Sequence, residues 1–291
     1  MNKTLQALLT SALAAIIAVG AVYAIHPTTE QPGAKESVFD RVMRTGILRC
    51  GYLIYRPEVI KDPNTGELSG YVFDIVNEIG RQLNVKVEWT TEIGFGFQNI
   101  PEDFKLGRYD AVCSGFVESA AHARAALFSI PVDYAPEYAY VRTDDTRFDQ
   151  SLDGINNPDI KIAQIDGEVT QAIAKEIFPL AGSYSLPETS DVSLALEAVA
   201  TGKADVAISA VATANGYLEH NAGKLKIIRN HMVKAWIQPV MAFPHGEHDF
   251  KYVVDATIRG LEQNGFIEKT FRKYDPNLNS YLMIARPYQA P

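Results

Sequence analysis

Two stretches of the chain share one pattern: GRYDAVCSG at residues 107–115 and GKADVAISA at residues 202–210. In each copy a glycine and an aspartate precede an apolar run that ends in small residues. Helix-like stretches at 100–106 and 192–201 stand before the two copies. Since glycine ends helices and short apolar runs are typical of buried strands, each copy predicts a helix, a stop and a strand. Gly-x-x-Asp also links helices to strands by chance, but the shared order of elements favours two similar α/β lobes.

The sequence ahead of the first copy alternates between strand and helix signals. Residues 47–55 form an apolar run expected of a buried strand. Asp74 is expected to cap a helix over about 75–83, whose apolar positions fall four apart. Residues 85–89 alternate between apolar and polar, as a strand does. In open α/β sheets of this kind, ligands bind outside the carboxyl ends of the strands, which here are marked by small residues.

Composition limits the class of protein. The chain has 291 residues, 47% of them hydrophobic and 21% charged, as expected of a globular protein of about two domains. Its net charge of -8 opposes binding to nucleic acid, because an acidic surface repels phosphate backbones. Two cysteines are too few for a zinc ribbon or a disulfide-stapled miniprotein.

The N-terminus carries a targeting signal. Lys3 precedes an apolar run at 8–24 that ends in small residues, which predicts a secretory signal peptide over residues 1–24. Residues 25–36 contain prolines and polar residues and are expected to be a linker. The alternative is an uncleaved N-terminal anchor. Either reading places the rest of the chain outside the cytoplasm, in the periplasm or an equivalent compartment.

Motifs for catalysis and cofactor binding are missing from the sequence. It contains no phosphate loop, Gly-x-Ser-x-Gly, Gly-x-Gly-x-x-Gly or His-Glu-x-x-His pattern. His245, Glu247, His248 and Asp249 form a cluster that hints at a metal, but no predicted helix fixes their spacing. A solvated loop is therefore the favoured interpretation, and we expect neither a metal nor a cofactor.

The order of several short motifs resembles a known family, the extracytoplasmic solute-binding proteins of family 3, which are polar amino-acid receptors of ABC importers. None of the motifs is specific alone, but their order and spacing are. The resemblance covers roughly residues 39–281. Its pieces are Leu48-Arg49-Cys50-Gly51-Tyr52, Tyr55-Arg56-Pro57, residues 66–71, the two glycine-aspartate repeats, Phe128-Ser129-Ile130-Pro131 and Asn264-Gly265-Phe266.

This resemblance implies a two-lobe α/β fold of the type II periplasmic-binding-protein kind. Each lobe would be a mostly parallel sheet with flanking helices, and two crossover strands near 138–142 and 237–242 would join them. Lobe 1 would comprise 37–137 and 241–291, and lobe 2 would comprise 138–240. The implied function is capture of a small polar solute between the lobes by a monomer that delivers it to an ABC permease in the inner membrane.

The family's ligand site carries over only in part. Tyr55 matches an aromatic residue that stacks on the ligand, and Phe97 matches a second wall, unless Phe95 takes that role. His122 occupies the place of the arginine that grips the ligand's α-carboxylate, and Arg124 lies two positions later. In the second lobe Ala210 occupies the place of the acid that binds the α-ammonium group.

Both halves of the usual amino-acid clamp are thus absent from their usual positions, so we expect a ligand that is recognised differently from a standard amino acid. His122 either hydrogen-bonds the ligand or is a surface or capping histidine. Asp166 and Glu168 either favour a helix N-terminus, the preferred interpretation, or contact a cationic ligand group. The expected ligand-binding positions are Tyr55, Phe97, Ser114, Gly115, Val117, Ser119, His122, Arg124, Gly167, Thr170 and Ala210.

The resemblance also implies a disulfide and leaves two other functions open. It places the strands that end near Cys50 and Cys113 side by side, within disulfide reach, in an oxidising compartment; two buried free thiols are the alternative. A membrane-tethered sensing module is the second functional hypothesis. The third is an enzyme, because a few relatives dehydrate small carboxylated substrates, with Glu58, Glu118 or His122 as candidate acid or base.

Overall fold

The computed structural model describes residues 36–93, 99–114, 118–276 and 278–284. The chain divides into two units, 1–37 and 38–291, and the elements below belong to the second. The expected signal peptide, nearly all of the expected linker, and Phe97, Gly115 and Val117 lie outside the described residues. Among the helices of the described part, none has the length and apolar character needed to cross a membrane.

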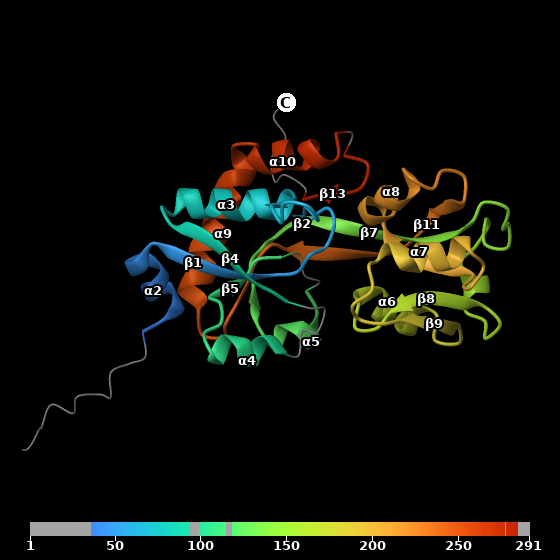
Figure 1. Ribbon diagram of the computed structural model, residues 1–291, viewed down its shortest axis with the longest axis horizontal. Coiled ribbons are helices and arrows are strands. Elements are labelled where there is room, and N and C mark those ends of the chain that lie inside the picture. The colour runs from blue at the N-terminus through green and yellow to red at the C-terminus, as the bar shows by residue number, and fades with distance from the viewer. Residues whose placement is uncertain (1–35, 94–98, 115–117, 277, 285–291) are drawn as a thin grey trace, which may run out of the picture. The chain divides into compact units, whose positions relative to one another are not determined.

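The first sheet has five strands in the order β4-β1-β5-β12-β6. Strand β1 is parallel to β4 and β5, whereas β12 is antiparallel to β5 and β6. Figure 1 shows this sheet with helices on both of its sides. The strands are β1 (Ile47–Tyr52), β4 (Lys86–Glu92), β5 (Ala111–Val112), β6 (Leu127–Phe128) and β12 (Ala242–Phe243), and the helices are α2 (Val38–Thr45), α3 (Tyr71–Gln82), α4 (Ile100–Lys105), α5 (Ala120–Ala123), α9 (His248–Gln263) and α10 (Phe266–Tyr274).

The second sheet follows the order β11-β7-β10-β8-β9, with β13 paired to β7. Strand β8 is parallel to β9 and β10, and the remaining pairs are antiparallel. Its strands are β7 (Pro131–Arg142), β8 (Lys161–Ile165), β9 (Gly182–Leu186), β10 (Val206–Ala210), β11 (Leu225–Pro239) and β13 (Leu282–Met283). Its helices are α6 (Val169–Ile177), α7 (Ser193–Ala200) and α8 (Val211–Leu218); a short turn of 3₁₀ helix (Asp153–Ile155) and a small ribbon of β2 (Ile60–Lys61) and β3 (Leu68–Ser69) complete the elements.

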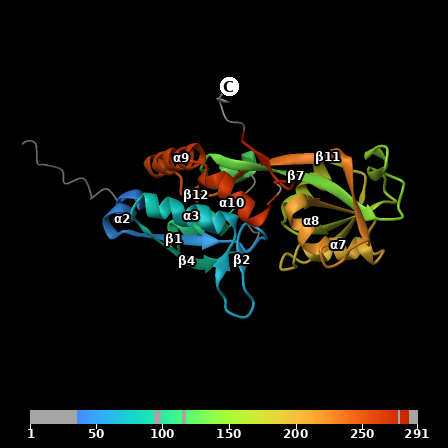
Figure 2. The same cartoon turned by 90° about the horizontal axis from the view of Figure 1, so that it is seen from above.

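The expected α/β class with two sheets is confirmed, but each sheet is mixed rather than mostly parallel. In the first sheet β12 is antiparallel to both of its neighbours. In the second sheet the long strands β7 and β11 pair antiparallel from Pro131 to Arg142 and lie side by side in Figure 2. Both strands begin well before the expected crossovers at 138–142 and 237–242. The exact lobe boundaries stay a prediction.

The sequence repeat corresponds to a repeated set of contacts. The Asp110 amide donates to the Arg49 carbonyl at 2.8 Å, and its Oδ2 accepts from the Arg49 amide at 2.7 Å. Asp205 does the same with Lys161, at 2.8 and 3.0 Å. Each carboxylate also pairs with an arginine at 2.7 Å, Arg49 in the first copy and Arg147 in the second. Both aspartates therefore tie a new strand to its parallel neighbour, β5 to β1 and β10 to β8.

The expectation that Asp74 caps α3 was wrong. The N-cap residue is Gly70, and Asp74 lies in the first turn of the helix. The Asp74 carboxylate accepts from the Lys273 ammonium at 2.7 Å and from the Tyr274 hydroxyl at 2.9 Å. Asp74 thus joins α3 to α10, which comes near the end of the chain.

The predicted disulfide is confirmed. Cys50 in β1 and Cys113 just after β5 are bonded, with their Cα atoms 5.4 Å apart. Both side chains are fully buried in the core of the first sheet. Because their sulfur atoms are bonded, the alternative of two buried free thiols is wrong. The bond joins two parallel strands that Asp110 already holds together.

The cluster at 245–249 is a largely exposed turn at the start of α9, close to the expected solvated loop, and its Glu247 side chain holds the start of α2. The Glu247 carboxylate accepts from the Val38 amide at 2.8 Å and the Phe39 amide at 3.1 Å, in the first turn of α2. The His245 ring nitrogen lies 3.1 Å from the Arg124 carbonyl. In the described residues, no group of three His, Cys, Asp or Glu side chains is placed to hold a metal ion.

Candidate functional site

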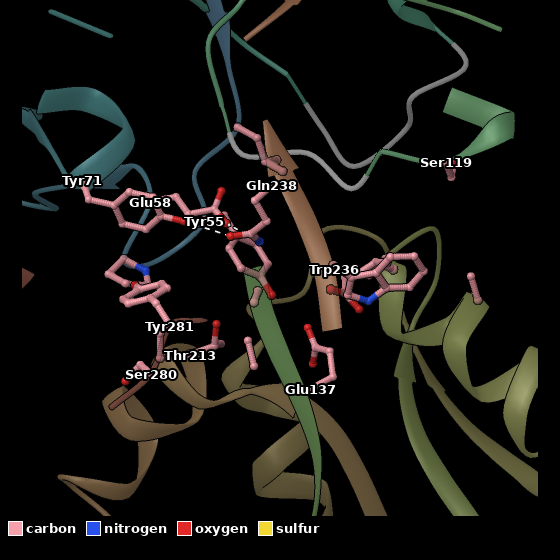
Figure 3. Close-up of a pocket in the computed structure, with 18 of the residues that line it drawn as sticks. Tyr55, Glu58, Tyr71, Ser119, Glu137, Thr213, Trp236, Gln238, Ser280 and Tyr281 are labelled. Atoms are coloured by element: carbon pink, nitrogen blue, oxygen red, sulfur yellow. Dashed lines mark hydrogen bonds between the residues drawn. The ribbon is translucent and has the colours of Figure 1, made fainter. Parts of the chain in front are cut away.

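A cavity of about 250 Å³ is lined by residues that come from both halves of the sequence (Figure 3). The segment after β1 supplies Tyr55 and Glu58, and β7 supplies Glu137. The turn between β8 and α6 supplies Glu168, and β11 supplies Trp236. The volume is slightly below that of sites for drug-sized ligands, so the cavity suits a small molecule.

Glu58 is positioned by the N-terminus of α3. The amides of Tyr71 and Val72 donate to the carbonyls of Pro57 and Glu58, at 3.2 and 3.1 Å. These contacts satisfy helix amides that would otherwise lack partners. Gly70 is required at the junction, because a Cβ atom there would lie 2.1 Å from the Glu58 carbonyl oxygen. Gly70 and Tyr71, at the end of the motif over residues 66–71, therefore hold the backbone that carries Glu58.

The Glu58 side chain belongs to a hydrogen-bonded chain. The Gln238 side-chain amide donates to Glu58 Oε1 at 3.1 Å, and its oxygen accepts from the Tyr71 hydroxyl at 3.1 Å. Glu58 is 4% exposed. Neighbouring Tyr55 is held by backbone hydrogen bonds in both directions with Val59, at 3.0 and 2.9 Å.

Glu168 has a structural contact and also faces the cavity. It is the N-cap of α6, and its carboxylate accepts from the Thr170 amide at 2.7 Å and from the Thr170 hydroxyl. Burial raises its pKa, while these two hydrogen bonds and one from Tyr55 lower it. The preceding Gly167 has a φ of 80°, which lets the chain turn from β8 into the helix. The expected helix N-terminus role of Glu168 is thus confirmed.

Glu137 is a buried acid with one carboxylate oxygen that makes no hydrogen bond. It is 3% exposed, and its Oε2 atom makes no hydrogen bond. Burial, with added repulsion from Glu168 and Glu58, raises the pKa of Glu137 well above its usual range. On the same strand Asp133 is fully buried with no hydrogen bond to either carboxylate oxygen, and its pKa is likewise raised. Two acids on one face of β7 are therefore held away from water.

Tyr55 lies in the field of three carboxyl groups. Burial raises the pKa of its hydroxyl well above the usual value, and Glu168, Glu137 and Glu58 raise it further. Figure 3 shows the Glu137 side chain directed toward the space beside Tyr55 and Trp236. Tyr55 is thus the residue around which the acidic groups of the cavity are arranged.

Aromatic side chains supply much of the remaining wall. Tyr71 and Tyr281 pack edge to face with ring centroids 5.3 Å apart. The Lys234 ammonium group lies 4.2 Å from the centroid of the Trp236 ring. The indole N–H of Trp236 is buried and makes no hydrogen bond. Aromatic faces of this kind attract cations as well as apolar groups.

The structure brings some of the predicted site residues to the cavity and leaves others away from it. Those that line it are Tyr55, Ser119, His122, Gly167 and Ala210. Ser119 accepts from the His122 amide at 3.2 Å as the N-cap of α5, so a local turn fixes the position of His122.

Three other predicted residues lie outside the cavity lining. The Ser114 hydroxyl is fully buried and bonds to the Leu53 backbone, donating at 3.2 Å and accepting at 3.3 Å. Thr170 is bonded to Glu168, and Arg124 is exposed at the C-cap of α5. Each of these side chains therefore has a place in the fold that differs from a cavity wall.

Sequence reasoning missed Glu137, Trp236, Gln238 and Tyr281, which come from the long strands and the C-terminal segment. One signal for Glu137 was present in the sequence. Asp133 and Glu137 lie four positions apart within 131–141, whose other residues are apolar or aromatic. Acids in such a run are unusual, because a buried charge needs a partner. Trp236 and Tyr281 carried no comparable signal.

Several solved structures share the fold. One is an ancestral amino acid-binding protein described as a precursor of cyclohexadienyl dehydratase, at 25% identity and a TM-score of 0.68, with 82% of this chain and 99% of that one covered. Others are a binding component of an ABC transporter from Wolinella succinogenes complexed with lysine (19% identity, TM-score 0.69, 78% and 95% covered) and a mutant of ArgBP from T. maritima (18% identity, TM-score 0.65, 82% and 100% covered). A search of curated proteins finds no significant match.

The family comparison agrees with the order of motifs, with the two mixed sheets and with a cavity lined by residues from both halves of the sequence. The family model of bacterial extracellular solute-binding proteins, family 3, matches residues 48–277. That range includes both glycine-aspartate repeats, the disulfide and most of the cavity wall. The chain is therefore a member of the bacterial extracellular solute-binding proteins, family 3.

Proposed function

We propose that this protein captures a small polar solute in the cavity and delivers it to an ABC permease in the inner membrane. The observation that carries the proposal is the composition of the cavity wall. Side chains from β7, β11 and the segments after β1 and β8 line one small space, in a member of a solute-binding family. Export by residues 1–24 would bring the protein to the periplasm, released or anchored according to whether that segment is cleaved.

The ligand is held in a way that differs from the family's usual amino-acid clamp. His122 and Ala210 line the cavity at the two positions where that clamp would have an arginine and an acid. The acids of the cavity come instead from Glu58, Glu137 and Glu168. Structural relatives that were solved with lysine or arginine support a small nitrogen-containing solute.

Thermal unfolding of the full chain against a panel of solutes tests this proposal. The panel holds the standard amino acids, small carboxylates, polyamines, and alcohol or quinone redox cofactors. A ligand at a hundred times its dissociation constant adds about 2.7 kcal/mol to stability, which is readily detected. A clear shift with one class supports solute capture, and absence of any shift across the panel contradicts it.

A dehydratase remains the second candidate, favoured by one observation. Burial raises the pKa of the Glu137 carboxyl, which makes it better suited than an exposed glutamate to act as a general acid. Loss of water from a solute that stabilises the protein, followed by mass spectrometry, distinguishes the two functions. Unchanged solute supports a receptor. A sensing module is distinguished by the intact mass of the exported protein, which would retain residues 1–24.

A further inference from the structure

We infer that the cavity takes a small organic cation without a carboxylate group, with Glu137 as its counter-ion and Tyr55 and Trp236 as its aromatic neighbours. This inference rests on the proposed function, since it names the chemical class of the solute for the same cavity. Amines, amidines and guanidines that carry no acid group belong to this class.

The first argument is the acidic composition of the cavity wall. Three carboxyl groups line the cavity, those of Glu58, Glu137 and Glu168, and each residue is 5% exposed or less. No lysine or arginine is among the described lining residues. The undescribed internal segments 94–98 and 115–117 contain no lysine or arginine in their sequence either. A buried site lined by three acids and no lysine or arginine among its described residues favours a ligand that brings positive charge with it.

The second argument is the state of Glu137. Its Oε2 atom is buried and makes no hydrogen bond. The cross-strand partner of Glu137 is Lys234, but the Lys234 ammonium pairs with Glu176 at 2.5 Å and lies over the Trp236 ring. Lys234 is thus adjacent to Glu137 in the sheet, but its ammonium group pairs with Glu176 instead. A bound N–H donor would satisfy the Glu137 oxygen directly.

The third argument is the aromatic wall. The Tyr55 hydroxyl lies in the field of Glu58, Glu137 and Glu168, and Figure 3 shows Glu137 directed between Tyr55 and Trp236. An ammonium or guanidinium group gains from aromatic faces and from a carboxylate at the same time. The small cavity of about 250 Å³ leaves room for a short apolar or diamine chain.

The same wall disfavours a ligand carboxylate. An acid group placed in the cavity would meet Glu58, Glu137 and Glu168, and the one basic side chain in the described lining is His122. Arg124, the nearest arginine to the family's clamp position, is exposed and outside the lining. A zwitterionic amino acid would therefore gain from its ammonium group and lose from its carboxylate.

Matched pairs of solutes separate these two contributions. Isothermal titration calorimetry of the full chain with cadaverine and lysine, agmatine and arginine, and tyramine and tyrosine compares each amine with the amino acid that differs only by the carboxylate. The inference predicts that in at least one pair the amine binds at least tenfold more tightly, which corresponds to about 1.4 kcal/mol. Glu137→Gln should weaken that amine at least tenfold, while Glu219→Gln, the same change at an exposed position, should leave it unchanged.

The outcomes separate failure of this inference from failure of the proposed function. Amino acids that bind as tightly as their amines, or binding only of neutral or anionic solutes, overturn the cation inference and leave solute capture intact. If none of the three amines binds at millimolar concentration, the cation inference is also overturned. If no solute of any class binds, solute capture falls as well. Thermal unfolding of Glu137→Gln verifies that it folds, and Glu137→Asp serves as a second variant, expected to retain part of the amine affinity.

Discussion

Glu58 and Gln238 are hydrogen-bonded at 3.1 Å although they lie 180 positions apart in the sequence. The bond joins the segment after β1 to the long strand β11, and the Tyr71 hydroxyl extends it by donating to Gln238 Oε1 at 3.1 Å. One wall of the cavity is therefore held by a polar chain that crosses between distant parts of the sequence. Such a chain gives the cavity a fixed shape before any ligand enters.

Gln238→Leu should destabilise the protein by roughly 1–3 kcal/mol, because it removes the amide donor of Glu58 and the acceptor of Tyr71 inside the protein. Urea unfolding followed by circular dichroism measures the change. Gln82→Leu, on the exposed side of α3, is the control and should have a small effect. Equal stability of Gln238→Leu and the parent protein would show that the polar chain contributes nothing.

Glu137→Gln should make the ligand-free protein more stable at neutral pH and alter it little at acidic pH. Because the pKa of Glu137 is raised in the folded state, its contribution to stability is present below the usual glutamate pKa and is lost as pH rises toward the raised value. The loss amounts to about 1.4 kcal/mol per pH unit within that window. Glutamine does not titrate, so the variant does not lose this stability as the pH rises.

The measurement is the midpoint of thermal unfolding of both proteins from about pH 4 to pH 8, around the usual glutamate range. Glu168, Glu58, Tyr55 and Tyr140 face Glu137 and are the same in both proteins, so their titration largely cancels in the difference. A stability difference that does not grow with pH would contradict the assigned state of Glu137.

Replacement of both Cys50 and Cys113 by alanine should lower the free energy of unfolding by about 4 kcal/mol, given their sequence separation of 63. The disulfide lowers the conformational entropy of the unfolded chain, and the variant loses that effect. Both cysteine side chains are buried in the core, so their truncation to alanine does not stabilise the folded state. Guanidinium unfolding of the variant and of the oxidised parent gives the difference. Labelling of the unreduced, denatured parent by a thiol reagent would contradict the disulfide itself.

Gly70→Ala should disrupt the protein near the cavity more than an ordinary helix N-cap change. Its Cβ atom would meet the Glu58 carbonyl at 2.1 Å, and φ at this position is 122°, a region that favours glycine. We expect a loss of at least about 2 kcal/mol in chemical unfolding and weaker ligand binding. Gly216→Ala, in α8 where a Cβ atom meets nothing within 4 Å, is the matched control and should be tolerated. Similar behaviour of the two variants would refute the packing argument.

The sequence predicted those features that depend on local pattern. The glycine-aspartate repeats predicted helix, stop and strand in both halves, and the structure adds that Asp110 and Asp205 make equivalent hydrogen bonds. The family resemblance led to the disulfide. Asp74 was misread because an aspartate near a helix start is a common cap, whereas here backbone carbonyls of distant residues satisfy the helix amides.

The cavity could be predicted only in part, since its acids depend on which strands meet. Tyr55 and His122 were found from motif position, but Glu137 and Trp236 come from β7 and β11, whose long pairing was not apparent. Ser114 was expected at the site because it follows a strand, yet its hydroxyl is used by the Leu53 backbone. Long-range pairing decides which side chains face the cavity, and short motifs do not encode it.

The affinity of the full chain for cadaverine relative to lysine tests the central claim most directly. The two solutes share the same cationic chain and differ by one carboxylate. An acidic cavity with Glu137 as counter-ion predicts at least tenfold tighter binding of cadaverine. Tighter binding of lysine would contradict it, because the carboxylate would then have a partner that the acidic wall of Glu58, Glu137 and Glu168 does not provide.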